Sequence, residues 1–402
     1  MKDFLKLLSK ERPVGTNANT ELVEMIEQSL SEMGYTVQSL PFNCMVWNSG
    51  LSSINTDNQS ITIEPSPFSE SFNGSGKLHL IKTLEQLENI NCKDDILVLA
   101  EDMTRTPLQP KNYPFYYPDE HKTIISLLEK KSPKAIIAVT GKNTLNGQNP
   151  FPLFEDGNFL IPSGSIEEQH LKELDKFFQL NVPVNLVIDS HKVEAKSRQI
   201  VASKKAKKSA GKIIIAAHMD TKYNTPGALD NATGVAVLLQ TAQSLKSSVY
   251  DIDIVPFNSE EFYGANGELE YLKLFDSEAQ NIALMINIDS PCHKGSETAI
   301  SFHNLPNPIE RITNTLIANS AKMSKGEEWY AGDHAPFIFR GVPCVVVTSS
   351  DFFDGALEYT HTQKDTLDTV DFELIKPTAQ FLADIIDSLS VREQQQRLPI
   401  DS

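Results

Sequence analysis

The pattern of hydrophobic positions predicts short buried strands that alternate with helices. In the C-terminal half, Ile- and Val-rich runs without a polar face are followed by segments whose apolar residues recur at helical spacing. Strands are expected at 212–217, 252–257, 283–288 and 342–348, and helices at 234–245, 265–275, 308–320 and 372–389. Such an alternation indicates an α/β domain with a mostly parallel central sheet between helices.

The pattern changes after the N-terminal helix expected at 19–33 and the strand expected at 35–40. From about residue 47 to 190, Ser- and Asn-rich loops separate short β runs at 96–100, 135–139 and 182–188. We therefore predict a smaller inserted domain, α+β or β-rich, over 47–190. The main domain comprises 1–46 and 191–392, and the charged, Gln-rich residues 393–402 are expected to form a flexible tail.

Two further segments are interpreted as turns without a function. The strands expected at 199–202 and 212–217 are predicted to be adjacent, and the Lys-rich run 203–209 between them to be a solvated hairpin loop. The segment 73–77, Asn-Gly-Ser-Gly-Lys, resembles a phosphate loop but lacks its first Gly spacing and the following Ser or Thr. It is predicted to be a flexible turn.

Composition and charge narrow the possible partners and the compartment. The 402 residues carry 36 basic and 53 acidic side chains, a net charge of -17, which argues against nucleic acid as a partner. Lys6 and Lys10 interrupt the apolar N-terminus, and no apolar run approaches the ~20 residues that span a bilayer. A cytoplasmic location without membrane contact is expected. The four cysteines lack CxxC spacing and are expected to be reduced thiols.

Histidines and carboxylates collect in five short segments, each at or just after the end of a predicted strand. These are 217–221 (AHMDT), 226–234 (PGALDNATG), 258–264 (NSEEFYG), 287–290 (NIDS) and 359–366 (YTHTQKDT). Open α/β sheets place their ligand sites at the carboxyl ends of strands. The dispersed residues are therefore expected to converge on one site.

Two histidines and several carboxylates without cysteine suit zinc or a similar divalent ion. Five residues suffice for two ions if one carboxylate bridges them: His218, Asp230, Glu261, Asp289 and His361. Asp230 is the best bridging candidate, because its turn leads into a helix and can present both oxygens. The alternative for Asp230 is a helix N-cap.

The adjacent carboxylates Glu260 and Glu261 would repel one another unless a cation lies beside them. With a metal present, one can bind the ion while the other accepts a proton from water as a general base. The alternative is a solvated acidic loop. Asp220 suits a hydrogen bond to the far ring nitrogen of His218. His334 either enters the site or stabilises its loop, and Asp365 has a possible structural role.

Together these segments resemble the co-catalytic zinc exopeptidases, the family of the bacterial leucyl aminopeptidases, glutamate carboxypeptidase II and the transferrin receptor. The family has an H-x-D strand end, a G-x-x-D-N-A-S-G-like turn, an E-E pair, a later Asp and a Y-x-H-T-x-x-D-T-like loop in this order. Residues 212–369 carry the resemblance, and Arg12-Pro-Val-Gly-Thr16 matches an R-x-x-G-T-like turn common in the family. The insert is similar in pattern to a protease-associated domain.

The resemblance implies a role for each matched residue. One zinc would be bound by His218 and Asp289, the other by Glu261 and His361, with Asp230 as the bridge, and Co²⁺ or Mn²⁺ could replace zinc. The resemblance also implies three further roles: Glu260 as general base, Asp220 as orienting carboxylate and Tyr330 as oxyanion stabiliser, although the spacing at Tyr330 departs by about one residue.

The activity expected from this resemblance is metal-dependent release of N-terminal residues from short peptides. A carboxypeptidase, an N-acyl-amino-acid hydrolase and a glutaminyl cyclase share the scaffold and remain alternatives. So does a binding protein that has lost catalysis. The residues give no indication of the oligomeric state or of the preferred side chain.

Overall fold

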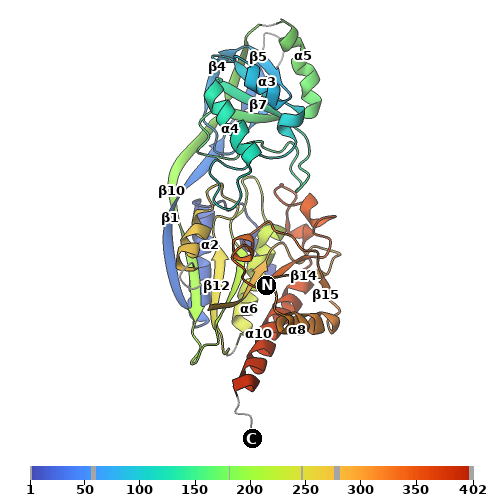
Figure 1. Cartoon of the computed structure of the whole chain (residues 1–402). Helices are drawn as coiled ribbons and strands as arrows, with labels where there is room; N and C mark the ends of the chain where they lie inside the picture. Colours follow the sequence, from blue (N-terminus) through green and yellow to red (C-terminus); the bar gives the residue numbers. More distant parts are fainter. Residues whose placement is uncertain (1, 56–59, 181, 246–247, 276–280, 398–402) are drawn as a thin grey trace. The chain divides into compact units, whose positions relative to one another are not determined.

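Two eight-stranded sheets organise the chain in the computed structural model. The structure describes residues 2–55, 60–180, 182–245, 248–275 and 281–397. Unit 1 comprises 1–43 and 196–402, and unit 2 comprises 44–195. The long strands β1 (Thr36–Ser49) and β10 (Ser190–Lys204) contain the residues at which the chain passes between the units (Figure 1).

The sheet of unit 1 has the strand order β1-β10-β12-β11-β13-β16-β14-β15. Four central strands are mutually parallel: β12 (Asp251–Phe257), β11 (Lys212–His218), β13 (Ile282–Ile288) and β16 (Cys344–Ser349). β10 and β14 (Thr298–His303) are antiparallel to their neighbours β12 and β16, and β15 (Met323–Lys325) lies parallel to β14. The predicted α/β class with a mostly parallel central sheet is confirmed.

The predicted pairing of the strands around 199–202 and 212–217 is wrong. β10 and β11 are separated in the sheet by β12, which pairs antiparallel with β10 and parallel with β11. The connection through 205–211 is therefore not a tight hairpin. The sequence pattern could not show this, because β12 enters the sheet from a segment that follows both strands.

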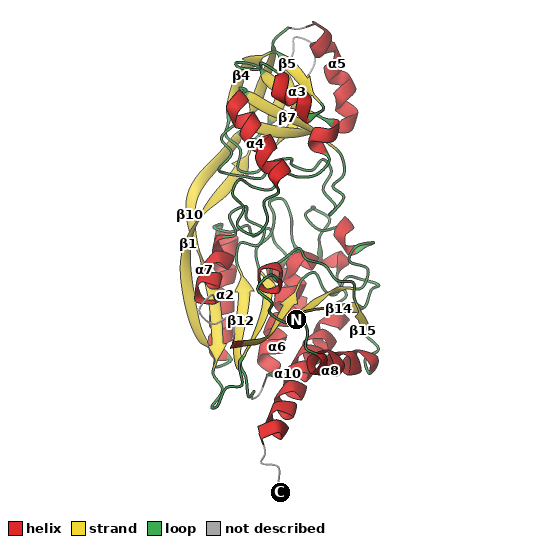
Figure 2. Cartoon of the chain, viewed as in Figure 1, coloured by secondary structure: helices red, strands yellow, loops and turns green. Residues whose placement is uncertain are grey.

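Helices pack against this sheet, and α6 and α10, labelled in Figure 2, contribute to the same core on one of its faces. Alternate residues of β11 face opposite sides, and Ile213, Ile215 and Ala217 join the core that includes side chains of α2, α6 and α10. Burial of each such isoleucine contributes roughly 1.5–3 kcal/mol. The helices are α1 (Lys2–Leu8), α2 (Asn17–Glu32), α6 (Gly234–Ser244), α7 (Asn266–Phe275), α8 (Asn307–Ala318), α9 (Ala335–Ile338) and α10 (Ile375–Arg397).

Two parts of unit 1 differ from the sequence pattern. β14 and β15 were not predicted, although β14 is fully buried. The last helix begins later than expected and continues to Arg397, so residues 393–397 of the predicted tail are helical. Residues 398–402 lie outside the described residues.

The sheet of unit 2 has the order β4-β9-β2-β3-β8-β7-β6-β5, with β5 to β8 mutually parallel. Its two faces bury separate apolar cores, one with α3 and α4 and the other with α5. The segment predicted as a turn at 73–77 instead forms most of β4. The bounds are β2 (Ser52–Asn55), β3 (Ser60–Pro65), β4 (Phe72–Gly76), β5 (Leu78–Ile81), β6 (Ile96–Leu99), β7 (Ala135–Thr140), β8 (Ser163–Glu167), β9 (Val184–Ile188), α3 (Leu84–Asn89), α4 (Asp119–Lys131) and α5 (Leu171–Leu180).

Two expectations about the whole chain concern thiols and membranes. All four cysteines are buried free thiols, as predicted. Among the described residues, no helix has the length and apolar character that a bilayer crossing requires.

Candidate metal centre

The residues predicted to bind metal gather at the carboxyl ends of the parallel strands of unit 1. His218 is the last residue of β11, and Asp289 directly follows β13. Glu261 lies four residues beyond the end of β12. Asp230 lies in the turn η3 (Ala228–Thr233) that leads into α6, and His361 lies in a loop that follows η5 (Ala356–Glu358).

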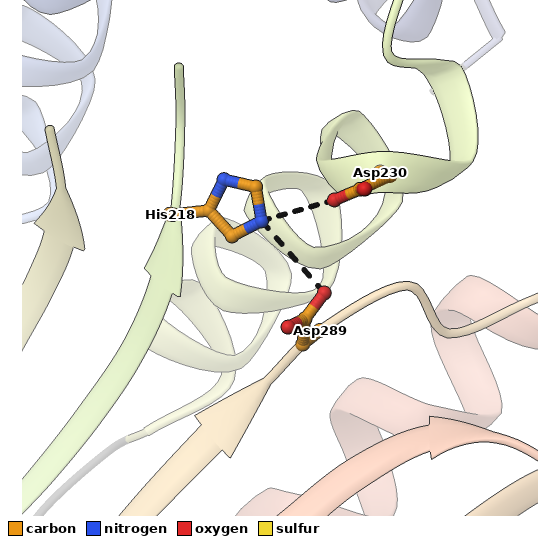
Figure 3. Close-up of side chains that lie close together, drawn as sticks. All are labelled: His218, Asp230 and Asp289. Atoms are coloured by element: carbon orange, nitrogen blue, oxygen red, sulfur yellow. Dashed lines mark ion pairs between the residues drawn. The ribbon is translucent and has the colours of Figure 1, made fainter. Parts of the chain in front are cut away.

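The first group consists of His218, Asp230 and Asp289 (Figure 3). The ring of His218 faces both carboxylates, with its Nε2 atom 3.0 Å from Asp230 Oδ1 and 3.7 Å from Asp289 Oδ1. All three residues are buried. One nitrogen and two carboxylate oxygens thus converge on one point from three separate elements.

The second group shares Asp230 and adds Glu261 and His361. His361 Nε2 lies 2.9 Å from Glu261 Oε1 and 3.3 Å from Asp230 Oδ2. Asp230 therefore presents Oδ1 to the first group and Oδ2 to the second. This is the arrangement that a carboxylate needs to bridge two ions.

The donor set fits two divalent cations. In each group, three potential ligand atoms lie within 4.8 Å of one another, all of them nitrogen or oxygen. Zinc accepts this mixture of imidazole and carboxylate. Buried carboxylates in such number are costly unless cations offset their charge. His218 Nδ1 is also buried, and no hydrogen-bond partner for it occurs among the described residues.

The turn around Asp230 is held by its own neighbours. The Asn231 side chain donates from Nδ2 to the Ile288 carbonyl (2.8 Å), and its Oδ1 accepts from the amides of Gly234 (3.0 Å) and Ser290 (3.1 Å). These bonds connect the turn to the end of β13, next to Asp289. Gly234 is required here, because a Cβ atom would lie 2.1 Å from Asn231 Oδ1.

Asp365 supports the same turn from the loop that carries His361. Its carboxylate accepts hydrogen bonds from the amides of Leu229 (2.7 Å) and Asp230 (3.0 Å). Burial, followed by the charge of Asp230, raises the pKa of Asp365 to about 7. These contacts match the structural role that the sequence suggested for Asp365.

Asp220 lies beside His218 but makes different contacts from those expected. Its Oδ1 atom is 4.0 Å from His218 Nδ1, beyond hydrogen-bond distance. Its carboxylate instead accepts from the amides of Glu260 (3.2 Å) and Glu261 (3.1 Å). The local HxD spacing suggests a contact with the histidine, whereas the fold places the backbone amides of the loop after β12 within hydrogen-bond distance of the Asp220 carboxylate.

Burial and neighbouring charges shift the pKa values of the two adjacent glutamates in opposite directions. Desolvation, followed by the charge of Glu261, raises the pKa of Glu260 well above its usual range. Burial alone would raise the pKa of Glu261, but the charges of His361 and Lys222 lower it. Lys222 Nζ donates to the Glu261 carbonyl (3.1 Å) and lies 3.4 Å from Glu261 Oε2. Glu261 thus lies between the basic side chains of His361 and Lys222, whereas Glu260 favours its protonated form in the absence of a further cation.

The loop that contains Tyr330 and His334 lies close to Asp289, since a Cβ atom on Gly332 would be 3.3 Å from Asp289 Oδ2. His334 is fully buried, its Nδ1 contacts Asn287 Nδ2 (3.2 Å) and its Nε2 contacts the Trp329 carbonyl (2.9 Å). Both ring nitrogens are therefore engaged, which matches a loop-stabilising role. Tyr330 is 54% exposed and donates to Glu328 (3.3 Å).

Sequence reasoning missed two buried carboxyl groups near the site. Glu268, in the first turn of α7, and Asp333 lie within hydrogen-bonding reach of one another. Burial, followed by the charge of Asp333, raises the pKa of Glu268 well above its usual range. The two groups are therefore expected to share a proton. A glutamate in an otherwise amphipathic helix carries no sequence signal of such burial.

A family model matches much of unit 1. Residues 199–386 match the model of peptidase family M28. This range includes His218, Asp230, Glu261, Asp289 and His361. The resemblance to the co-catalytic zinc exopeptidases is thereby confirmed.

Solved structures share the fold over nearly the whole chain. An aminopeptidase from Aneurinibacillus sp. strain AM-1 has a TM-score of 0.73 at 20% identity, covering 96% of this chain and 92% of that one. A zinc aminopeptidase from Bacillus subtilis has a TM-score of 0.70 at 18% identity, covering 96% and 94%. At these identities the likeness shows the fold.

One curated relative matches a shorter stretch. A probable lipoprotein aminopeptidase of Mycobacterium tuberculosis is 33% identical over 111 residues. The match spans 27% of this chain and 22% of the relative.

Proposed function

We propose that this protein is a metal-dependent aminopeptidase that acts on short peptides, because residues 199–386 match the model of peptidase family M28. The observation that supports the proposal is the pair of ligand groups that share Asp230. Glu260 directly precedes Glu261, a member of the second group. The names of the similar structures, an aminopeptidase and a zinc aminopeptidase, support the same reaction.

We assign two metal sites to the two groups. His218 and Asp289 would hold one zinc ion, Glu261 and His361 the other, and Asp230 both. When bound, the ions polarise the scissile carbonyl and lower the pKa of water. Co²⁺ or Mn²⁺ could take the same ligands.

Glu260 is proposed as the general base. It directly precedes the proposed ligand Glu261, and in its ionised form its carboxylate can accept a proton from the attacking water and donate it to the departing amine. Asp220 acts through the backbone of Glu260 and Glu261, because its carboxylate accepts both amide hydrogens. An oxyanion role for Tyr330 stays a prediction.

The proposal is tested by Glu260→Gln with Glu21→Gln as the matched control. Glu21 is an exposed residue of α2 in the same unit. We expect kcat to fall by about 10²–10⁴-fold in Glu260→Gln, the usual contribution of a general base, with unchanged zinc content. Unchanged peptidase turnover in Glu260→Gln would contradict the assignment.

A substrate panel separates aminopeptidase activity from the alternatives. Peptides with free and blocked N-termini, free and amidated C-termini, N-acyl amino acids and N-terminal Gln peptides cover the related reactions. An aminopeptidase requires the free α-amine. Hydrolysis that requires the free carboxylate would indicate a carboxypeptidase, and absence of both turnover and bound metal would indicate a binding protein.

The cytoplasmic location stays a prediction.

A further inference from the structure

Arg12 lies far from the metal ligands in sequence but is bonded to the loops that carry them. Its side chain is 2% exposed. Its Nε atom donates to the Met219 carbonyl (2.7 Å), and Nη2 donates to the Gly227 carbonyl (3.0 Å). Nη1 donates to the carbonyls of Leu8 (2.6 Å), Lys10 (3.1 Å) and Pro226 (3.0 Å). One guanidinium group thus joins three segments of backbone.

Two of these segments lead directly to ligands of the first group. Met219 follows His218, and Gly227 precedes Asp230 by three residues. The Arg12 amide also donates to Thr221 Oγ1 (2.9 Å), which adds a second bond to the loop after β11. The distance between His218 and Asp230 therefore depends on carbonyls that Arg12 holds at fixed positions.

The packing around Gly227 leaves this loop little room to move. Gly227 has φ +62°, and a Cβ atom there would lie 2.3 Å from Thr221 Cγ2 and 3.1 Å from Arg12 Nη1. A planar fork with five N–H donors suits several carbonyls at once, whereas a lysine ammonium has three donors on a single atom. Lysine at position 12 could keep the charge but not this set of bonds.

The same N-terminal segment also reaches the loop of Glu260 and Glu261. Asn19, in α2, donates from Nδ2 to Asn258 Oδ1 (2.8 Å), and Asn258 Nδ2 donates to Ser197 Oγ (2.8 Å). Asn258 is the first residue after β12. Residues 12–19 therefore contact the loops that follow both β11 and β12.

The charge of Arg12 suits this position. Burial lowers the pKa of Arg12 to about 10, so the guanidinium group stays protonated at neutral pH. Asp365, Asp220 and Asp230 counteract that lowering through their charges. In return, the cation offsets part of the negative charge collected at the strand ends.

We propose that Arg12 is a positioning residue that sets the separation of His218 and Asp230 for metal binding. This inference rests on the proposed function, in which these two residues bind metal. The hydrogen bonds of the Arg12 guanidinium group within the described chain all go to backbone carbonyls. Its effect is therefore expected on metal affinity and on the rigidity of the 219–230 segment.

The test compares Arg12→Lys with Arg198→Lys. Arg198 is a half-buried arginine of the same unit whose guanidinium group bonds to Glu27 (2.8 Å). Co²⁺ affinity is measured by competition with a chromophoric chelator, and amide hydrogen exchange in 219–230 is measured in metal-free protein. We expect Arg12→Lys to bind Co²⁺ about 10-fold more weakly, the lower end of the loss seen when a direct hydrogen-bond partner of a ligand is changed, and to exchange faster in this segment. Arg198→Lys should match the parent chain in both.

A milder variant covers the case in which Arg12→Lys does not fold. Thr221→Val keeps the side-chain shape but removes the oxygen that accepts the Arg12 amide hydrogen. It should shift both measurements in the same direction by a smaller factor. Parent-like Co²⁺ affinity and exchange in the folded variants would overturn the Arg12 proposal while leaving the aminopeptidase proposal intact. If the parent chain binds no Co²⁺, the metal assignment fails, and so does the Arg12 proposal, whereas peptide turnover remains measurable separately.

Discussion

Both units contain four mutually parallel strands, yet within the described part of the chain only the strand ends of unit 1 carry clustered side chains that could hold a metal ion. In unit 1, β11, β12 and β13 lead into His218, Glu260 and Asp289. In unit 2, the strands β5, β6, β7 and β8 lead into Lys82, Ala100, Gly141 and Glu168. Among the described residues, both groups able to hold a metal ion lie in unit 1. Parallel topology alone therefore does not make a site.

The charged residues at the two edges also differ in exposure. In unit 2, Lys82 and Glu101 form an ion pair of 2.6 Å with side chains 38% and 57% exposed. In unit 1, the contact between His218 and Asp230 joins side chains that are 2% and 8% exposed. Exposed pairs contribute little because water screens them, whereas buried charges require compensation from nearby groups. The supporting bonds from Arg12, Asn231 and Asp365 are thus as characteristic of unit 1 as the ligands themselves.

The largest expected effect in this comparison comes from Asp230→Asn, with Glu101→Gln as the equivalent change in unit 2. Asparagine keeps the shape of Asp230 but replaces one of its two oxygens with an amide that cannot bridge. We expect metal affinity to fall by more than about 100-fold, the upper end of the loss seen when only a partner of a ligand changes. Metal-to-protein ratios in zinc-buffered solution measure this. If Asp230→Asn kept the metal-to-protein ratio of the parent chain, the strand ends of unit 1 would not differ from those of unit 2 in binding metal through Asp230.

A smaller effect is expected in the acid stability of unit 1. Burial lowers the pKa of His334 to about 4, opposed by its bond to the Trp329 carbonyl and reinforced by His303. The unfolded chain binds the proton near pH 6.5, so stability is lost as the pH falls from about 6.5 to about 4. The loss is on the order of 3 kcal/mol, because a tenfold change in proton affinity corresponds to about 1.4 kcal/mol.

His334→Gln tests this origin, with His191→Gln in unit 2 as the control. His191 has a side chain that is 68% exposed. Denaturant unfolding at several pH values should show a smaller acid loss in His334→Gln than in the parent, even though its stability at pH 7 is lower. Equal pH slopes for the parent and His334→Gln would show that His334 is not responsible.

The smallest effect is expected for the exposed pair of unit 2. Glu101→Gln removes the ion pair with Lys82 but no buried contact. The free energy of unfolding should change by less than about 1 kcal/mol, and the change should shrink at high salt. Denaturant unfolding with and without added salt measures both. A salt-insensitive loss of several kcal/mol would show that this edge is more than a solvated surface.

Local hydrophobic patterns predicted most central elements of unit 1 within a few residues. β11, β12, β13 and α6 are examples, because their burial is encoded in consecutive residues. Strand order was not encoded in this way, and the pairing predicted for 199–202 with 212–217 is wrong because β12 lies between them. β14 was missed, although all of its residues are buried, because its sequence mixes Thr, Ser and His with apolar residues.

The sequence by itself determined which residue types stand at the strand ends, since these follow directly from segments with strong local patterns. His218, Asp230, Glu261, Asp289 and His361 were named there, and their role as ligands stays a prediction. Only the tertiary structure decided that Asp230 divides its two oxygens between the groups and that Asp220 bonds to the glutamate amides. It also decided the position of Arg12, which bonds to a carbonyl 207 residues away. Such contacts depend on how distant loops meet, and no local spacing records that.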